Sequence, residues 1–221
     1  MMAVFEKGER LRHIGHLDIQ RAMQRALRRS GMPVKYSQGF NPHILVTFAS
    51  ALSTGAWGKK ELMDVTLRED VAPETFLQAM NAALPPDMQL SFCRTLEDQH
   101  PALMAQVAAA DYTMTLTDDD AARKCAESVE GFLAQETIME MRKTKSGLKE
   151  CDIRPLIHHL AVEGNQIHAV LTLRETTSCK PDMLVRALCR FAGCEVPRFL
   201  TVRNGLLGEN AQGELTALET L

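Results

Sequence analysis

The spacing of apolar and polar residues predicts alternating strands and helices. Residues 16–30 give the clearest helix, because their apolar positions recur at helical spacing: Ile19, Met23, Ala26 and Leu27. Gly31 stands where a helix C-cap belongs. Further helices are expected at residues 121–133 and from Pro73 and Pro181 onward. Extended segments are expected at residues 3–6, 34–40, 44–49, 62–67, 88–93, 112–116, 138–141, 156–162, 167–173 and 199–202.

The same order of elements occurs twice. Residues 73–80 and 181–188 both read Pro, acid, any residue, two apolar residues, polar, Ala, apolar. We therefore expect an α+β protein of two ferredoxin-like β-α-β-β-α-β halves, at residues 1–97 and 110–221, produced by internal duplication. The alternative is that any two amphipathic helices opened by Pro resemble each other.

Composition is that of an ordinary folded protein, with 45% hydrophobic and 24% charged residues and a net charge of -3. No segment approaches the roughly 18 consecutive apolar residues of a membrane helix. The first residues lack the apolar core and cleavage site of a signal peptide. We therefore expect a cytoplasmic protein with no membrane partner.

Charge is unevenly distributed, because residues 1–44 carry eight Lys and Arg against three acidic residues. Arg21, Arg25 and Arg28 follow helical spacing and form one basic ridge, without acidic residues four positions on. Arginine matches phosphate geometry well, so the ridge is a candidate nucleic-acid contact. The alternative is a solvated helix face.

A short aromatic and polar segment follows this helix. Its candidate nucleic-acid contacts are Tyr36, Gln38, Phe40, Asn41 and His43. The segment could stack bases or bind another ligand. It could equally be a turn in which Phe40 belongs to the core. Because Gly39 lies between bulky neighbours in a turn, we predict a backbone conformation there that other residues adopt with strain.

A second basic stretch lies at residues 142–149, where we expect a mobile cationic loop. Lys143 and Lys145 in this stretch are further candidate nucleic-acid contacts. Arg154 is another, in a more ordered turn where Asp152 and Arg154 could orient each other. The alternative is a surface loop with no special role.

The search for catalytic motifs is negative. No phosphate-binding loop, nucleophile elbow or cluster-binding Cys-x-x-x-Cys-x-x-Cys occurs. His13 and His16 lack a third metal ligand at a set spacing, so His16 is expected to make a local hydrogen bond. Cys125 and Cys189 fall on apolar helix faces and are expected to be core thiols. We therefore expect no catalytic residue, cofactor, iron–sulfur cluster, bound SAM or structural zinc.

Several motifs resemble a known bacterial family. They are His16-Leu17-Asp18, Ala26-Leu27-Arg28-Arg29-Ser30-Gly31, Tyr36-Ser37-Gln38-Gly39-Phe40-Asn41-Pro42-His43, Asp152-Ile153-Arg154-Pro155 and Lys180-Pro181. The chain resembles the radical-SAM-linked family of unknown function, whose members occur alone or fused to B12-binding-type radical-SAM proteins. The resemblance implies a radical-SAM protein as partner. Leu156 departs from the aromatic residue expected there.

The combined expectation is a non-catalytic adaptor that presents RNA, or another substrate, to a radical-SAM enzyme. One alternative is a protein-interaction module that only docks on that enzyme. Another is an RNA-processing or RNA-modifying enzyme.

Overall fold

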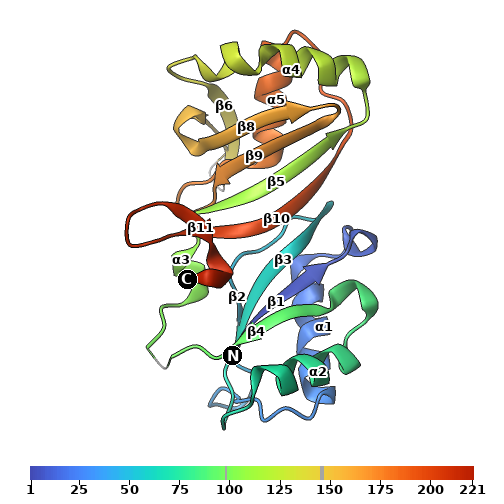
Figure 1. Ribbon diagram of the computed structural model, residues 1–221, viewed down its shortest axis with the longest axis vertical. Coiled ribbons are helices and arrows are strands. Elements are labelled where there is room, and N and C mark those ends of the chain that lie inside the picture. Colours follow the sequence, from blue (N-terminus) through green and yellow to red (C-terminus); the bar gives the residue numbers. More distant parts are fainter. Residues whose placement is uncertain (98, 145–146) are drawn as a thin grey trace. The chain divides into compact units, whose positions relative to one another are not determined.

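Residues 1–107 and 208–221 form the first of two units in the computed structural model, which describes residues 1–97, 99–144 and 147–221. Its antiparallel sheet has the strand order β4-β1-β3-β2. Its strands are β1 (Met2–Lys7), β2 (Val46–Phe48), β3 (Ala56–Val65) and β4 (Leu90–Arg94). Helices α1 (His16–Arg29) and α2 (Pro73–Ala83) pack on this sheet through one shared core (Figure 1). The short helix α3 (Leu103–Gln106) packs against β2 and β3.

Helix α1 confirms the helix predicted from apolar spacing. Its buried residues are the predicted stripe: Ile19, Met23, Ala26 and Leu27. These side chains pack against strand residues such as Phe5 and Met63. Gly31 follows the helix with a φ of 72°, a left-handed conformation that glycine adopts without strain. The helix therefore buries one face and leaves the opposite face in solvent.

The second unit spans residues 108–207. Its antiparallel sheet has the strand order β10-β5-β9-β8. The strands are β5 (Ala109–Leu116), β8 (Ile157–Glu163), β9 (Gln166–Thr172) and β10 (Phe199–Glu209). Helices α4 (Asp119–Leu133) and α5 (Pro181–Phe191) lie side by side (Figure 1). The Asp118 carboxylate caps α4 by accepting a hydrogen bond from the Ala121 N–H, 2.9 Å away.

A two-stranded hairpin replaces the loop expected at residues 142–149. It contains β6 (Met139–Thr144) and β7 (Gly147–Asp152). The prediction of a loop is therefore wrong for residues 142–144 and 147–149, which pair as antiparallel strands, while residues 145–146 lie outside the described residues. The strands were missed because a run of lysines shows no apolar alternation from which a strand can be read. Residues 34–40, expected to be extended, contribute only isolated bridges at Val34 and Tyr36.

The α+β class is confirmed, and the sheet strands of the two units share one order. If these strands are numbered along each unit, leaving out the β6–β7 hairpin, both units have the order 4-1-3-2. Each unit also places one long helix after its first strand and another before its fourth.

The unit boundary differs from the predicted second half, 110–221, because residues 208–221 belong to the first unit. Close packing around Gly208 accounts for the placement of the tail in the first unit. A Cβ there would lie 2.9 Å from the Gln106 carbonyl oxygen and 3.1 Å from a Leu218 methyl carbon. The strand that completes the second unit therefore continues into a tail that packs within the first.

Candidate nucleic-acid interface

The outward face of α1 carries the predicted basic ridge. Arg21, Arg25 and Arg28 are all exposed. They span about 10 Å along the axis, at a rise of about 1.5 Å per residue. The ridge is partly neutralised, because the Arg21 guanidinium lies 2.8 Å from the Asp18 carboxylate. The expectation that the ridge lacks acidic partners is therefore wrong at Arg21, since the acid stands three positions before it rather than four after.

Arg25 and Arg28 differ from Arg21. Within the described residues neither has an ion-pair partner. The neighbouring Arg29 points elsewhere and donates to the Ala83 carbonyl oxygen at 2.7 Å, which ties α1 to the end of α2. The ridge thus presents two unpaired guanidinium groups toward the C-terminal end of the helix.

The Tyr36–His43 loop is closed at its base. The Ser37 N–H donates to the His43 carbonyl oxygen at 2.8 Å, and the His43 N–H donates to the Ser37 hydroxyl at 3.1 Å. A third hydrogen bond joins Ser37 Oγ and His43 Nδ1 at 2.8 Å. Tyr36 and Ile44 form an antiparallel bridge just outside. These bonds fix the loop's base, so that its conformational freedom is already restricted.

The tip of the loop points into solvent. Gly39 has a φ of 123°, which confirms the predicted unusual backbone. Phe40 is fully exposed, at 105% of its reference area, and Tyr36 is 39% exposed. Gln38 and Asn41 are exposed as well. The alternative that placed Phe40 in the core is wrong, because Val34 and Ile44 fill the core positions at either end of the loop.

One core supports both features. Val34 and Ile44 belong to the same buried cluster as Met23 and Leu27 of α1. Only residues 30–35 separate the helix from the loop. The end of the ridge and the base of the loop are therefore positioned by the same packed side chains.

The remaining candidates lie in the second unit. Lys143 stands in β6, and Lys145 lies outside the described residues. The Arg154 side chain donates from Nε to the Leu133 carbonyl oxygen at 2.9 Å, at the end of α4. The Arg154 backbone N–H donates to Asp152, also at 2.9 Å. Arg154 therefore satisfies a helix terminus, and Asp152 organises the turn through the backbone rather than through the guanidinium.

Sequence reasoning missed Glu140, which is only 5% exposed. Its carboxylate lies 3.0 Å from Arg190 and 3.5 Å from Arg186, both on α5. The carboxylate also accepts the Met141 N–H at 3.0 Å. The group fastens the β6–β7 hairpin to α5 beside an open pocket of about 290 Å³. In the sequence, Glu140 alternates with the apolar residues Met139 and Met141. This pattern gave no sign that Glu140 is the buried residue of the three.

A second buried group lies under the start of α1. Lys7 is 2% exposed and donates to the carbonyl oxygens of Ala56 at 3.0 Å and Arg12 at 3.3 Å. The adjoining cavity, also lined by His16 and Glu61, holds only about 10 Å³. It has room for one water molecule at most. His16 makes the expected local hydrogen bond, with Gln20 at 3.0 Å. This group fixes the turn that leads into α1.

Comparison with known proteins gives a family but no activity. None of the helices in the described part of the chain is long and apolar enough to cross a membrane. No curated protein matches the chain. Residues 1–185 match a family described as uncharacterised proteins conserved in bacteria, and this range includes the α1 ridge, the Tyr36–His43 loop and Arg154 but not Arg186 or Arg190. The chain therefore belongs to that family, DUF2344.

Proposed function

We propose that this protein binds single-stranded RNA through the α1 ridge and the Tyr36–His43 loop. The observation that carries the proposal is the fully exposed ring of Phe40 at the tip of a closed loop. Bases stack on exposed aromatic rings with little dependence on sequence. Because hydrogen bonds already restrict the loop's base, binding would require little further ordering.

The ridge supplies the second part of the interaction. Arg25 and Arg28 would hold phosphates, while Phe40 or Tyr36 stacks on a base. Arg21 would exchange its Asp18 partner for a phosphate, so its contribution is expected to be smaller. Phosphate contacts of this kind position the strand without reading its sequence.

The proposal favours unpaired RNA over duplex RNA. An aromatic ring can stack only on a base that is accessible, and bases in an A-form helix are covered by their neighbours. A ridge acting alone would bind both forms through their phosphates.

We further propose that the protein is a non-catalytic adaptor for a radical-SAM enzyme. Two features support this: the resemblance of the quoted motifs to radical-SAM-linked proteins, and a sequence without the cysteine spacing for an iron–sulfur cluster. Affinity capture from native cells, with identification of both bound protein and bound RNA, tests this part. Capture without a radical-SAM protein contradicts it.

The shared strand order supports a finer description of the fold. We propose that the two units are ferredoxin-like repeats of one ancestral unit, because both have the order 4-1-3-2 with antiparallel neighbours. Superposition of the units tests the idea: α1 must coincide with α4, and α2 with α5. Helices that fail to coincide contradict it.

The RNA proposal is tested by titrating the purified protein with a single-stranded RNA of about 12 nucleotides, a length within the range of known single-strand sites. A duplex of the same sequence is the comparison. The single strand is expected to bind more tightly, and Phe40→Ala is expected to remove that preference. Equal binding of both forms contradicts the stacking role. If neither binds, docking of Phe40 on a protein partner is the better account.

A further inference from the structure

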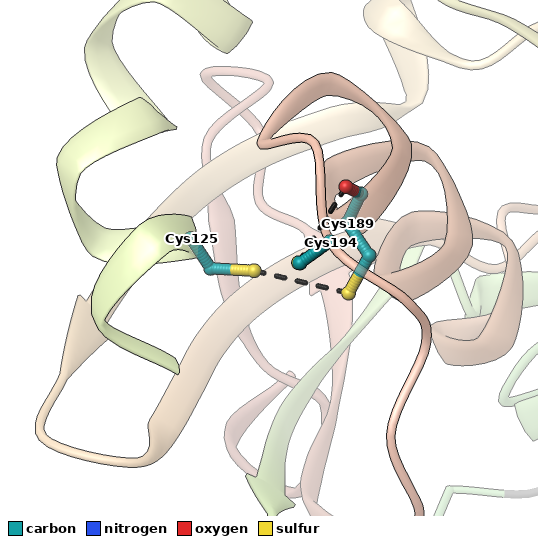
Figure 2. A group of neighbouring side chains, drawn as sticks. All are labelled: Cys125, Cys189 and Cys194. Atoms are coloured by element: carbon teal, nitrogen blue, oxygen red, sulfur yellow. Dashed lines mark hydrogen bonds between the residues drawn. The ribbon is translucent and has the colours of Figure 1, made fainter. Parts of the chain in front are cut away.

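Three cysteines of the second unit meet at one point. Cys125 lies on α4 and Cys189 on α5, and both are fully buried. Figure 2 shows their sulfur atoms pointing toward each other, with Sγ–Sγ at 3.8 Å. Cys194, which is half-buried, lies beside them. All three Sγ atoms are within 4.8 Å of one another.

The third cysteine is positioned by the end of α5. Gly193 has a φ of 67° and reverses the chain. The Cys194 N–H then donates to the Cys189 carbonyl oxygen at 3.0 Å, and the Gly193 N–H donates to the Arg190 carbonyl oxygen at 3.3 Å. This pair of bonds is the Schellman motif of a helix C-terminus. The motif returns residue 194 to residue 189, so a five-residue separation in sequence becomes a contact between side chains.

The spacing of the sulfur atoms fits one bound metal ion. Three thiolates about 2.3 Å from a central ion lie roughly 4.0 Å apart in a planar arrangement. The Cys125–Cys189 separation is 3.8 Å, and the other two Sγ–Sγ separations do not exceed 4.8 Å, so small rotations of the side chains would complete this geometry. A disulfide would join only two of the three sulfur atoms and leave the convergence of the third unexplained.

The number of ligands selects the kind of ion. Among the described residues no further His, Cys, Asp or Glu joins this group. Structural zinc sites close with four protein ligands, so zinc would need a water molecule among buried thiols. Soft thiolate ligands favour Cu(I), which does not require a fourth ligand here.

We propose that Cys125, Cys189 and Cys194 form a three-coordinate thiolate site for one soft metal ion, best matched by Cu(I). The site links α4, α5 and the turn that follows α5. Cys194 is its partly exposed member and gives the ion a route from solvent. The site lies in the second unit and shares no residue with the proposed RNA surface, so the two proposals stand or fall separately.

The test is an anaerobic titration of the reduced full-length protein with Cu(I), in competition with a chromogenic Cu(I) chelator. We expect one tightly bound ion per chain and a higher midpoint of thermal unfolding, because a ligand that binds only the folded state stabilises it. Cys194→Ser is the main variant, since this side chain is half-buried and its replacement leaves both buried thiols in place. It should weaken Cu(I) binding by at least about 100-fold, because removing a ligand should cost no less than the roughly 10- to 100-fold that follows loss of a residue hydrogen-bonded to a ligand.

Cys151→Ser is the matched control. Cys151 is also half-buried in the second unit but is not part of the cluster, so its replacement should leave the Cu(I) affinity unchanged. Cys125→Ser and Cys189→Ser should also lose the ion, with folding verified by circular dichroism. Three results overturn the proposal: no retained Cu(I), equal affinity in Cys194→Ser, or stoichiometric zinc that Cu(I) does not displace.

Discussion

Single residues in the Tyr36–His43 loop have separate roles. Ser37 and His43 close its base through hydrogen bonds between backbone and side chains. Gly39 allows the turn, at a φ of 123° where other residues are strained. Phe40 makes no contribution to the core, since its ring is fully exposed. The residues that shape the loop are thus different from the residue proposed to contact RNA. The two roles can therefore be tested with separate substitutions.

Phe40→Ala should leave stability nearly unchanged, because exposed substitutions usually alter the free energy of unfolding by less than about 0.5 kcal/mol. If the ring stacks on a base, single-stranded RNA should bind roughly 5- to 150-fold more weakly, from about 1–3 kcal/mol per stacked base. Chemical denaturation and fluorescence anisotropy measure the two effects. A variant that unfolds more easily but binds normally would assign Phe40 a structural role instead.

Two cysteines outside the metal-site cluster should show strongly suppressed reactivity. Burial raises the pKa of Cys93 to about 11 and that of Cys179 to about 12. Because these pKa values are raised, both thiols stay protonated at about pH 8. Only the thiolate form reacts, so both react slowly at that pH. Alkylation by iodoacetamide should therefore rise about tenfold per pH unit between about pH 8 and pH 10. Mass spectrometry follows each residue, with the denatured protein as control. A rate that levels off below about pH 9 in the folded protein contradicts the shifts.

At the scale of elements, the sequence patterns located most helices and strands. They did not show which partners the polar residues on those elements have. The apolar stripe of α1 was readable because it recurs at one helical period. The β6–β7 hairpin was read only at residues 138–141, because the lysines that follow show no apolar alternation. The ion pairs of Glu140 were not readable either, because Arg186 and Arg190 lie on α5, far along the chain. Helical spacing placed Arg21 on the ridge. Its ion pair with Asp18 could not be read from that spacing, because the pair depends on the side-chain conformations of both residues. Long-range partners such as those of Glu140 leave no local signal in the sequence.

Arg154 distinguishes a structural role from an RNA-binding role. Its guanidinium hydrogen-bonds the last residue of α4, so Arg154→Ala should lower the free energy of unfolding by about 1–2 kcal/mol. The RNA affinity of the folded variant should stay within about twofold of wild type, since less than about 0.5 kcal/mol is then at stake. Urea denaturation and an RNA titration give the two values. If the Arg154→Ala variant keeps its stability but binds RNA more weakly, Arg154 contacts RNA rather than supporting the fold.

At the scale of the whole molecule, the chain order does not follow the unit boundary. The first unit takes residues from both ends of the chain, 1–107 and 208–221, while the second is continuous. The tail packs through Leu218, which is 1% exposed. Sequence periodicity could not assign this tail, because β10 is a single strand that runs through the boundary between residues 207 and 208.

Two glycines of β10 test the tail's packing. Gly208→Ala would push a Cβ to 2.9 Å from the Gln106 carbonyl oxygen, so it should lower the free energy of unfolding by about 1–3 kcal/mol. Gly205→Ala is the matched control, because a Cβ there meets nothing within 4 Å. Its effect should stay below about 0.5 kcal/mol. Equal effects in denaturant titrations would mean that the tail is not tightly packed.

The central claim, that the α1 ridge holds RNA phosphates, is tested most directly by the salt dependence of binding. Affinity for single-stranded RNA is measured between about 50 and 200 mM salt for wild type and for the Arg21→Ala, Arg25→Ala, Arg28→Ala triple variant. Replacement of Arg123 and Lys124 on α4 by Ala is the charge-loss control, because both are already paired with acids. The account predicts that the triple variant binds more weakly and that its log–log slope is flatter by about 2, at about 0.7 per phosphate. Equal slopes for the triple variant and wild type would contradict it.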